Sequence, residues 1–321
     1  MRLLLTGADG FTGQHLTRAA QVAKYEVFAL AGDLQDASKV KAQVDTIKPT
    51  HVIHLAGISH VTGEDAAAYY GVNLLGSLNL LTALKGLALP PAKVILASTA
   101  NVYGNHAASP ISEQEAPAPI THYSMSKLAM EYMSRPFLEY FPIMITRPFN
   151  YTGVGHDVRF VIPKIIAHFQ KKAPGIELGN IDVLREYNDV RDVCAIYLQL
   201  LSLGQSGQTY NIASNRVYAL REVLTRLEKL SGQRMTVTQN PQFLRANEIF
   251  TLAGDPRHLE ACIGPIAWRL LDDTLQWMLS EWHHGADRTK TKFLGWLGGC
   301  GYFYISTQGL YQIKISYKSY Y

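Results

Sequence analysis

A glycine-rich turn directly after the first apolar segment places the strongest constraint on how this chain can fold. Residues 1–6 read Met-Arg-Leu-Leu-Leu-Thr, and Gly7, Gly10 and Gly13 follow at regular spacing. Glycines placed in this way let a strand turn sharply into a helix, and they let the free N–H groups of the helix start approach a phosphate. The spacing is Gly-x-x-Gly-x-x-Gly rather than the common Gly-x-Gly-x-x-Gly. It therefore predicts either a pyrophosphate-binding turn or an ordinary turn with glycines packed against the helix.

Apolar runs of strand length alternate with segments of helix length through the first half of the chain. The runs are Leu3–Leu5, Val27–Leu30, Val52–Leu55, Val94–Ala97 and Ile143–Thr146. Such alternation is typical of βαβ units, which build a parallel sheet with helices on its faces. We therefore expect an α/β fold with a Rossmann-type doubly wound parallel sheet over residues 1–150, and site residues where its strands end.

Beyond residue 150 the pattern is less regular. Helices are expected at residues 160–169, 191–202 and 220–231, and short strands at 210–212 and 235–238. We expect strands and helices from about 183–212 to return to the first domain, and residues 151–284 to form a smaller mixed substrate-binding lobe. Residues 285–321 are an atypical basic and aromatic tail, in which alternating apolar side chains from Tyr311 to Tyr317 predict an amphipathic strand. This tail is either an added hairpin or a poorly ordered extension.

A tyrosine and a lysine four residues apart are the clearest candidates for chemistry. Tyr123 and Lys127 share one face of a predicted helix. The lysine ammonium group is expected to lower the pKa of the phenol, so that the tyrosine can exchange a proton with a carbonyl or alcohol oxygen. Thr99 follows the fourth apolar run, and its hydroxyl is expected to hold the same oxygen. The pair alone is weak support, but these three residues, called the trio below, follow the glycine turn in the expected order.

Together these motifs resemble those of the extended short-chain dehydrogenases/reductases that act on nucleotide sugars. His54-Leu-Ala-Gly57, the segment starting at Asn73 and Arg147-Pro-Phe-Asn150 also fall where that family has similar motifs, and the resemblance spans about residues 1–282. It implies that the trio of Thr99, Tyr123 and Lys127 is catalytic. The cofactor-binding residues that it implies are Gly7, Gly10, Phe11, Thr12, Gly13, Asp33, Leu34, Leu55, Ala56, Gly57, Asn73, Tyr123, Lys127 and Pro148. The implied substrate-binding residues are Ser59, Thr99, Asn101, Asn150, Val161, Arg185, Arg245 and Glu248, and no metal is implied.

The resemblance implies NADPH as the cofactor, with NADH also accepted. An acidic residue about 20 positions past the glycines is typical of NAD binding, and a basic one of NADP binding. Here Asp33 and Leu34 follow the second apolar run, and no arginine stands there to hold a 2′-phosphate. Asp33 resembles the family's adenine-contacting aspartate, so we expect loose discrimination between the two cofactors.

The resemblance also suggests the substrate and the reaction. The segment Leu244-Arg245-Ala-Asn-Glu248 resembles the stretch that binds the diphosphate and ribose in GDP-mannose dehydratases and GDP-4-keto-6-deoxy-D-mannose reductases. The 4,6-dehydratases carry a carboxylate two residues beyond the catalytic threonine, where this chain has Ala100 and then Asn101. The expected reaction is therefore reduction of the C4 ketone of GDP-4-keto-6-deoxy-D-mannose to GDP-D-rhamnose or its C4 epimer.

Two alternatives stay open at this point. A nucleotide-sugar 4-epimerase uses the same trio but keeps its NAD bound. A non-catalytic relative would bind NADP as a sensor or scaffold, although an intact Thr99, Tyr123 and Lys127 argue against this, because a binding module has no use for a tuned phenol.

Charge and composition argue against other classes of partner. The net charge of +4 resides in residues 285–321, so the remaining body is balanced and gives no support for nucleic-acid binding. No apolar stretch is long enough to span a bilayer, and no signal peptide precedes the first strand, so we expect a cytoplasmic protein without a membrane partner. Cys194, Cys262 and Cys300 lack metal-ligand spacing. The resemblance further implies a homodimer formed through a four-helix bundle.

Overall fold

The computed structural model describes residues 1–59, 65–106, 109–243, 249–281, 302–306 and 309–313. The chain divides into two compact units, Met1–Trp282 and His283–Tyr321, and each is described by itself. In the second unit, β14 (Tyr302–Ser306) and β15 (Gly309–Ile313) pair as an antiparallel hairpin. The part of the predicted amphipathic strand beyond Ile313 lies outside the described residues.

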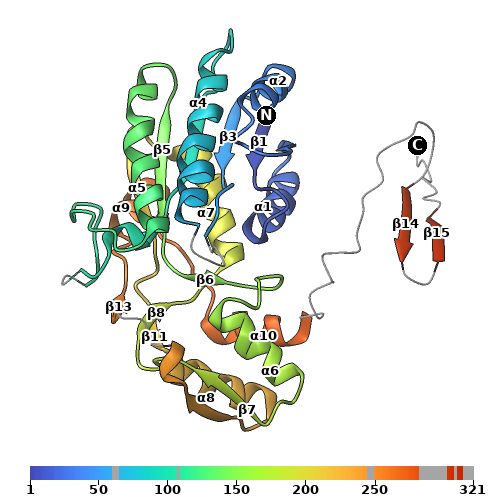
Figure 1. Ribbon diagram of the computed structural model, residues 1–321, viewed down its shortest axis with the longest axis vertical. Coiled ribbons are helices and arrows are strands. Elements are labelled where there is room, and N and C mark those ends of the chain that lie inside the picture. The colour runs from blue at the N-terminus through green and yellow to red at the C-terminus, as the bar shows by residue number, and fades with distance from the viewer. Residues whose placement is uncertain (60–64, 107–108, 244–248, 282–301, 307–308, 314–321) are drawn as a thin grey trace. The chain divides into compact units, whose positions relative to one another are not determined.

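A six-stranded parallel sheet forms the centre of the first unit (Figure 1). Its strand order is β10-β5-β4-β3-β1-β2, and every neighbouring pair is parallel. The predicted Rossmann-type parallel sheet is thereby confirmed, and each of the five apolar runs overlaps one strand. The strands are β1 (Arg2–Thr6), β2 (Glu26–Leu30), β3 (His51–His54), β4 (Lys93–Ala97), β5 (Ile143–Pro148) and β10 (Thr209–Ile212).

Helices cover both faces of this sheet, because alternate side chains of its strands are apolar on both sides. Leu3, Leu5 and Ile95 pack in one core with α1, α7 and α9. Leu4 and Val94 pack in a second core with α2, α4 and α5 on the opposite face. The covering helices are α1 (Phe11–Val22), α2 (Ala37–Ile47), α4 (Ser77–Lys85), α5 (His122–Ser134), α7 (Val190–Leu203) and α9 (Arg257–Ile263).

The helix that ends in α4 has an unusual middle part. It starts as α3 (Ala66–Tyr70), continues as a π-helical stretch (Gly71–Gly76) and then becomes α4 without a break. Wide π-helical turns are rare and frequently lie at functional sites. This one contains Asn73, whose side chain is completely buried.

The later part of the first unit forms a smaller lobe with its own apolar core, around Ile165, Val223 and Leu275. Its sheets are mixed, since β8 pairs antiparallel with β11 and parallel with β13. The helices are α6 (Val161–Gln170), α8 (Leu220–Ser231) and α10 (Leu271–Glu281). The strands are β6 (Tyr151–Thr152), β7 (Gly175–Leu178), β8 (Leu184–Glu186), β9 (Asn188–Asp189), β11 (Val217–Ala219), β12 (Thr236–Gln239) and β13 (Thr251–Leu252). Short 3₁₀ turns cover Ala100–Tyr103, Arg135–Glu139 and Pro241–Phe243.

Close packing explains two glycines of the turn after β1. Gly7 has a φ of +69°, and a Cβ there would lie 2.9 Å from the backbone nitrogen of Ala56. A Cβ on Gly13 would collide with the carbonyl oxygen of Gly7. Only glycine tolerates both demands without strain. The turn is thereby held against β1 and the loop after β3, at the edge of the sheet where the site residues gather.

Candidate active site

The residues predicted to form the site follow the carboxyl ends of five parallel strands. Because parallel strands end at one edge of a sheet, the loops that follow them meet there, and ligands of such sheets bind at this edge. The residues in strand order are Gly7 after β1, Asp33 and Leu34 after β2, Leu55, Ala56 and Gly57 after β3, Thr99 after β4, and Pro148 and Asn150 at the end of β5.

Reciprocal capping fixes the start of α5 just before Tyr123. The Thr121 hydroxyl accepts a hydrogen bond from the Ser124 N–H (3.2 Å), and the Ser124 hydroxyl accepts one from the Thr121 N–H (3.1 Å). These bonds satisfy two amides that a helix start leaves free. Tyr123 therefore lies in the first turn of α5, and Lys127 follows one turn later.

The structure brings the trio together. The Thr99 hydroxyl lies close enough to the Tyr123 phenol to act on its pKa, so the end of β4 and the start of α5 meet here. Thr99 also caps the 3₁₀ turn that follows it, because its hydroxyl accepts a hydrogen bond from the Asn101 N–H at 3.2 Å. Lys127 is buried and donates a hydrogen bond to the carbonyl oxygen of Ala97 at 2.8 Å.

The expected direction of the Tyr123 pKa shift is wrong. Burial raises the pKa of the Tyr123 phenol, while its hydrogen bond with Thr99 opposes the rise. The Lys127 ammonium group is directed to the Ala97 carbonyl, and burial lowers the pKa of Lys127 to about 8. The shared helix face was readable from the sequence. The burial that raises the pKa of Tyr123 was not readable, because burial depends on the elements packed around the residue.

Asn73 connects the loop after β3 to α5. Its side-chain oxygen accepts a hydrogen bond from the Ile58 N–H at 2.8 Å, and its NH₂ group donates one to the Ser126 hydroxyl at 2.9 Å. Gly57 lies directly against this amide, since a Cβ on Gly57 would be 2.9 Å from both Asn73 Oδ1 and Lys127 Nζ. The loop, the π-helical stretch and α5 thus converge around Lys127.

A buried chain of hydrogen bonds behind Asn73 fixes the tautomer of His54. The Ser77 hydroxyl donates a hydrogen bond to the backbone carbonyl oxygen of Asn73 (2.7 Å). The oxygen of this hydroxyl must therefore accept its other hydrogen bond from the N–H at His54 Nε2 (2.7 Å). His54 Nδ1 accepts from the Thr6 hydroxyl (2.6 Å), which itself accepts from the Ala56 N–H (3.0 Å). Burial lowers the pKa of His54 to about 3, so its ring is neutral near pH 7. The sequence placed His54 in a motif but gave no sign of this supporting role.

The start of α1 suits an anion. Gly10 precedes the helix, and no side chain caps it, so the N–H groups of the first turn point to the site. Phe11 stacks on His156 with 4.3 Å between ring centroids, and the Thr12 hydroxyl hydrogen-bonds with the Tyr151 hydroxyl at 2.8 Å. These contacts join the glycine turn to the segment that leads into α6.

The residues predicted to bind substrate are more dispersed. Ser59 and Asn150 are exposed, Asn101 is half-buried, and Val161 begins α6. Arg185, on β8, donates hydrogen bonds to the backbone carbonyls of Leu184 (2.8 Å) and Phe250 (3.1 Å). Arg245 and Glu248 lie outside the described residues.

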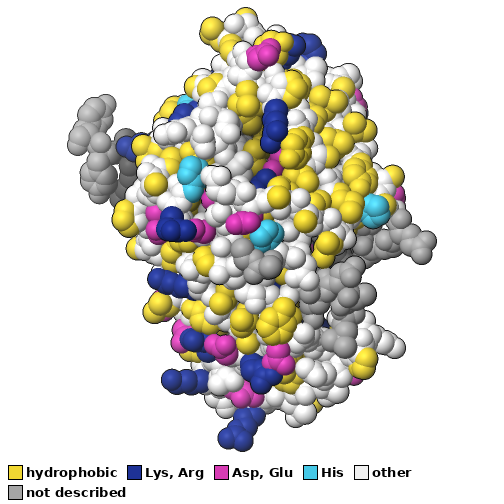
Figure 2. All heavy atoms as spheres, turned by 90° about the vertical axis from the view of Figure 1, so that its left-hand side faces the viewer, with side chains coloured by type: hydrophobic (Ala, Val, Ile, Leu, Met, Phe, Trp, Pro, Cys, Tyr) yellow, Lys and Arg dark blue, Asp and Glu magenta, His cyan; other side chains and the backbone are white. Residues whose placement is uncertain are grey.

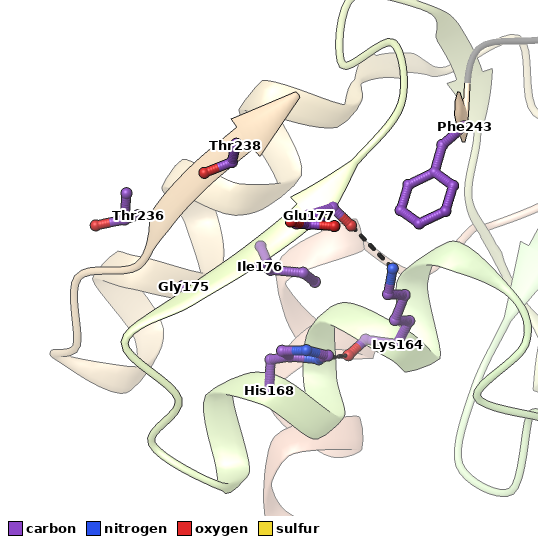
Figure 3. A pocket seen from close by; sticks show the side chains of 8 residues that line it. All are labelled: Lys164, His168, Gly175, Ile176, Glu177, Thr236, Thr238 and Phe243. Carbon is purple, nitrogen blue, oxygen red and sulfur yellow. Dashed lines mark hydrogen bonds between the residues drawn. The ribbon is translucent and has the colours of Figure 1, made fainter. Parts of the chain in front are cut away.

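Two surface hollows lie beside these elements. One, of about 420 Å³, lies between α6, β7 and β12 and is shown in Figure 3. In it, Lys164 donates a hydrogen bond to the Glu177 carbonyl at 2.9 Å, and its ammonium group lies 4.9 Å from the ring centroid of Phe243. The other hollow, of about 380 Å³, lies beside the glycine turn and is lined by Ala8, Asp9, Gln14, Thr17, Arg18, Val27 and Ala29.

Metal ligands and membrane spans were also sought. Within the described ranges, no group of three or more His, Cys, Asp or Glu side chains could hold a metal ion. No helix in the part of the chain that the structure describes is both long enough and apolar enough to cross a membrane. Cys194 and Cys262 are free thiols, and Cys300 falls outside the described residues.

Comparison with known proteins agrees with this geometry. Residues 3–213 match the NAD dependent epimerase/dehydratase family. The chain is 33% identical over 269 residues to GDP-6-deoxy-D-talose 4-dehydrogenase of Aggregatibacter actinomycetemcomitans, covering 82% of this chain and 92% of the relative. It is also 33% identical over 297 residues to GDP-6-deoxy-D-mannose reductase of Pseudomonas aeruginosa, covering 88% and 97%. The solved structure of RMD from Pseudomonas aeruginosa complexed with NADPH is similar with a TM-score of 0.80 at 32% identity, covering 88% of this chain and 97% of that one.

We expect His54 to make the free energy of unfolding depend on pH. In the unfolded chain its ring binds a proton near pH 6.5, whereas in the folded protein it does so only at about 3. Since the unfolded state binds more protons between these values, the contribution of His54 to stability is complete above pH 6.5. It falls by at most about 1.4 kcal/mol per pH unit as the pH is lowered through this window.

Urea unfolding of the wild type and of His54→Asn across this window measures the effect. The variant should be less stable at neutral pH and should lose stability less steeply on acidification. The exposed His258 provides the control, because His258→Gln should leave the slope unchanged. Equal slopes for the wild type and His54→Asn would contradict the assigned neutral, buried ring.

Proposed function

The chain belongs to the NAD dependent epimerase/dehydratase family, and we propose that it reduces the C4 ketone of GDP-4-keto-6-deoxy-D-mannose with NADPH. The product is GDP-D-rhamnose or its C4 epimer. The observation that carries the proposal is the joining of Thr99 and Tyr123 beside a buried Lys127, with no carboxylate at positions 100 and 101. The two relatives at 33% identity, which are named for GDP-6-deoxy sugars, support the choice of substrate.

The residues of the trio have distinct tasks in this reaction. When bound at the glycine turn, NADPH supplies the hydride. The Thr99 hydroxyl holds the C4 oxygen of the sugar, and the Tyr123 phenol gives that oxygen a proton as the carbonyl becomes an alcohol. Lys127 would hold a ribose hydroxyl of the cofactor through a hydrogen bond, and its charge would favour the phenolate that remains on Tyr123.

Burial raises the pKa of Tyr123, so the phenol is protonated near pH 7, which is the form that reduction consumes. A 4-epimerase uses the same trio, first as a base and then as an acid, and stays the alternative within enzymes. A sensor or scaffold would need neither form.

Elimination of water is not supported by the residues near Thr99. Ala100 is buried and has no acidic group, and Asn101 cannot donate a proton as an acid does. Asp65, on the neighbouring segment, caps α3 by accepting a hydrogen bond from the Ala68 N–H at 3.2 Å. A carboxylate engaged in that way is a poor proton donor to a departing hydroxyl.

We infer that Arg18, which no sequence motif singles out, faces the 2′-phosphate of NADPH. Its hollow lies between the glycine turn and β2, where sheets of this type place the adenosine ribose. Arg18 and Asp9 line the same hollow, and helical side chains generally lean toward the helix start, here the glycine turn. A guanidinium group binds phosphate well, whereas Asp9 in the same hollow opposes it. An arginine that attracts the 2′-phosphate and an aspartate that repels it fit the expected loose discrimination between NADPH and NADH.

Arg18→Gln should weaken NADPH binding by roughly 10-fold and leave NADH binding nearly unchanged, because only NADPH carries the 2′-phosphate. Titration of the protein with each cofactor, followed by fluorescence, gives both dissociation constants. Arg234→Gln removes an exposed arginine of the lobe and serves as the matched control. An equal loss for both cofactors would refute the assignment.

The proposed enzyme is a homodimer that pairs α5 and the α3–α4 helix with their copies. These helices lie side by side, with the Tyr70 hydroxyl 3.9 Å from the Met125 sulfur. They expose large apolar side chains, since Leu75 is 53% and Tyr132 is 51% exposed. Figure 2 shows hydrophobic side chains over much of the upper part of one face, with a few charged ones among them and more charged ones lower down. Such exposed apolar surface is typical of an interface.

In sedimentation at micromolar concentration, the protein should have twice the 35.7 kDa mass of one chain. Leu75→Glu should shift the mass toward the monomer, because a charge in the centre of an apolar interface is costly to bury. A monomeric wild type would contradict this arrangement.

The central test compares two reactions on one binding site. GDP-4-keto-6-deoxy-D-mannose with NADPH should be consumed with loss of the nicotinamide absorbance, whereas GDP-mannose with NADP should not be dehydrated. Tyr123→Phe keeps the ring but removes the proton donor, so kcat should fall by about 10²-fold or more while sugar binding changes little. Formation of the 4-keto-6-deoxy product from GDP-mannose, or full activity of Tyr123→Phe, would sink the proposal.

A further inference from the structure

Glu131 and Arg147 form a buried ion pair directly behind the trio. Arg147 donates hydrogen bonds from Nε to Oε1 (3.0 Å) and from Nη2 to Oε2 (2.6 Å) of Glu131. Each residue is only 6% exposed. Removing two charges from water costs so much free energy that a buried pair is weak evidence for a purely stabilising role. The neighbours of this pair indicate another one.

The Glu131 carboxylate influences two places that matter for the trio. Its Oε1 also accepts a hydrogen bond from the Ser98 hydroxyl at 2.5 Å, and Ser98 directly precedes Thr99. Glu131 also lies one helical turn after Lys127 on the same face of α5, where its charge favours the protonated amine. One carboxylate therefore contacts the strand end that leads to Thr99 and acts on the Lys127 ammonium group through its charge.

The groups around Lys127 come from several packed elements. Tyr123 and Glu131 lie on α5, and neutral His54 lies on β3, where the charge of Lys127 helps to lower its pKa. Arg147, on β5, reaches the cluster through Glu131. Of these groups only Glu131 carries a negative charge. It is the one that can offset the cost of keeping Lys127 charged while buried.

We propose that Glu131 is a positioning residue for the C4 reduction, which fixes the end of β4 behind Thr99 and keeps Lys127 in its charged form. It acts through Ser98 and Lys127 rather than on the sugar. Arg147 holds the carboxylate in place through its two parallel hydrogen bonds. The inference rests on the proposed function, because it gives the charged Lys127 a part in that reaction.

Glu131→Gln keeps the shape of the side chain and removes its charge. Lys127 should then lose its proton at lower pH, so the basic limb of the kcat/KM profile for the keto sugar should move down by about one pH unit. Glu131→Asp keeps the charge and should leave the limb within a few tenths of a unit of the wild type. Glu139→Gln removes an exposed carboxylate just beyond α5 and should not move it.

A second variant separates charge from folding. Glu131→Gln leaves Arg147 buried without its partner, which can unfold the chain. The double variant Glu131→Gln with Arg147→Met removes both charges and should recover the Tm, while the basic limb stays shifted. Recovery of the Tm together with the wild-type limb would mean that the pair is only structural, and the proposal would be overturned.

An NMR titration of the Lys127 side chain gives a readout that needs no turnover. The wild-type amine should titrate at about 8, and that of Glu131→Gln at a lower pH. If the wild type does not oxidise NADPH with the keto sugar, the proposed function fails, yet this titration still reports the influence of Glu131. An unchanged Lys127 titration in a folded Glu131→Gln variant would overturn the inference independently of the substrate.

Discussion

The buried amide of Asn73 is the interaction on which the geometry of the site depends. A buried amide must satisfy its donors and its acceptor within the protein, and Asn73 does so with Ile58 on the loop after β3 and Ser126 on α5. Its own carbonyl receives the chain of hydrogen bonds that runs back through His54 to β1. These hydrogen bonds connect the glycine turn after β1, the loop after β3 and the helix that carries Tyr123, and they hold the three segments in position relative to one another.

The sequence was sufficient for the features that depend on local order. Strands with apolar residues on both faces, the glycine spacing and the shared helix face of Tyr123 and Lys127 could all be read from neighbouring letters. What it could not supply were contacts between distant segments. Ser98, Glu131 and Arg147 meet through three separate elements. The burial that raises the pKa of Tyr123 likewise depends on packing that no local pattern encodes.

Two buried titratable residues of the site, Lys127 and His54, differ in whether a group of opposite charge lies nearby. Lys127 is buried but has Glu131 nearby, while His54 is buried without a counter-charge and stays neutral. The site therefore holds the buried positive charge of Lys127 and keeps His54 neutral near pH 7. Such an environment suits the transfer of one proton to an oxygen that becomes negative. It offers little help to a reaction that needs a separate acid at the neighbouring carbon.

The late position of β10 in the sequence has a consequence for how the protein folds during synthesis. This strand pairs with β5, but it comes after α6, the strands β7 to β9 and α7 in the sequence. During synthesis, a chain that has emerged only as far as β5 exposes the unpaired edge of that strand, a surface prone to pairing with other chains. The sheet is completed only after part of the lobe has been made. The nucleotide-binding half and the lobe are thus interleaved in their folding, and a cut between them at residue 150 would leave the first half with an open edge.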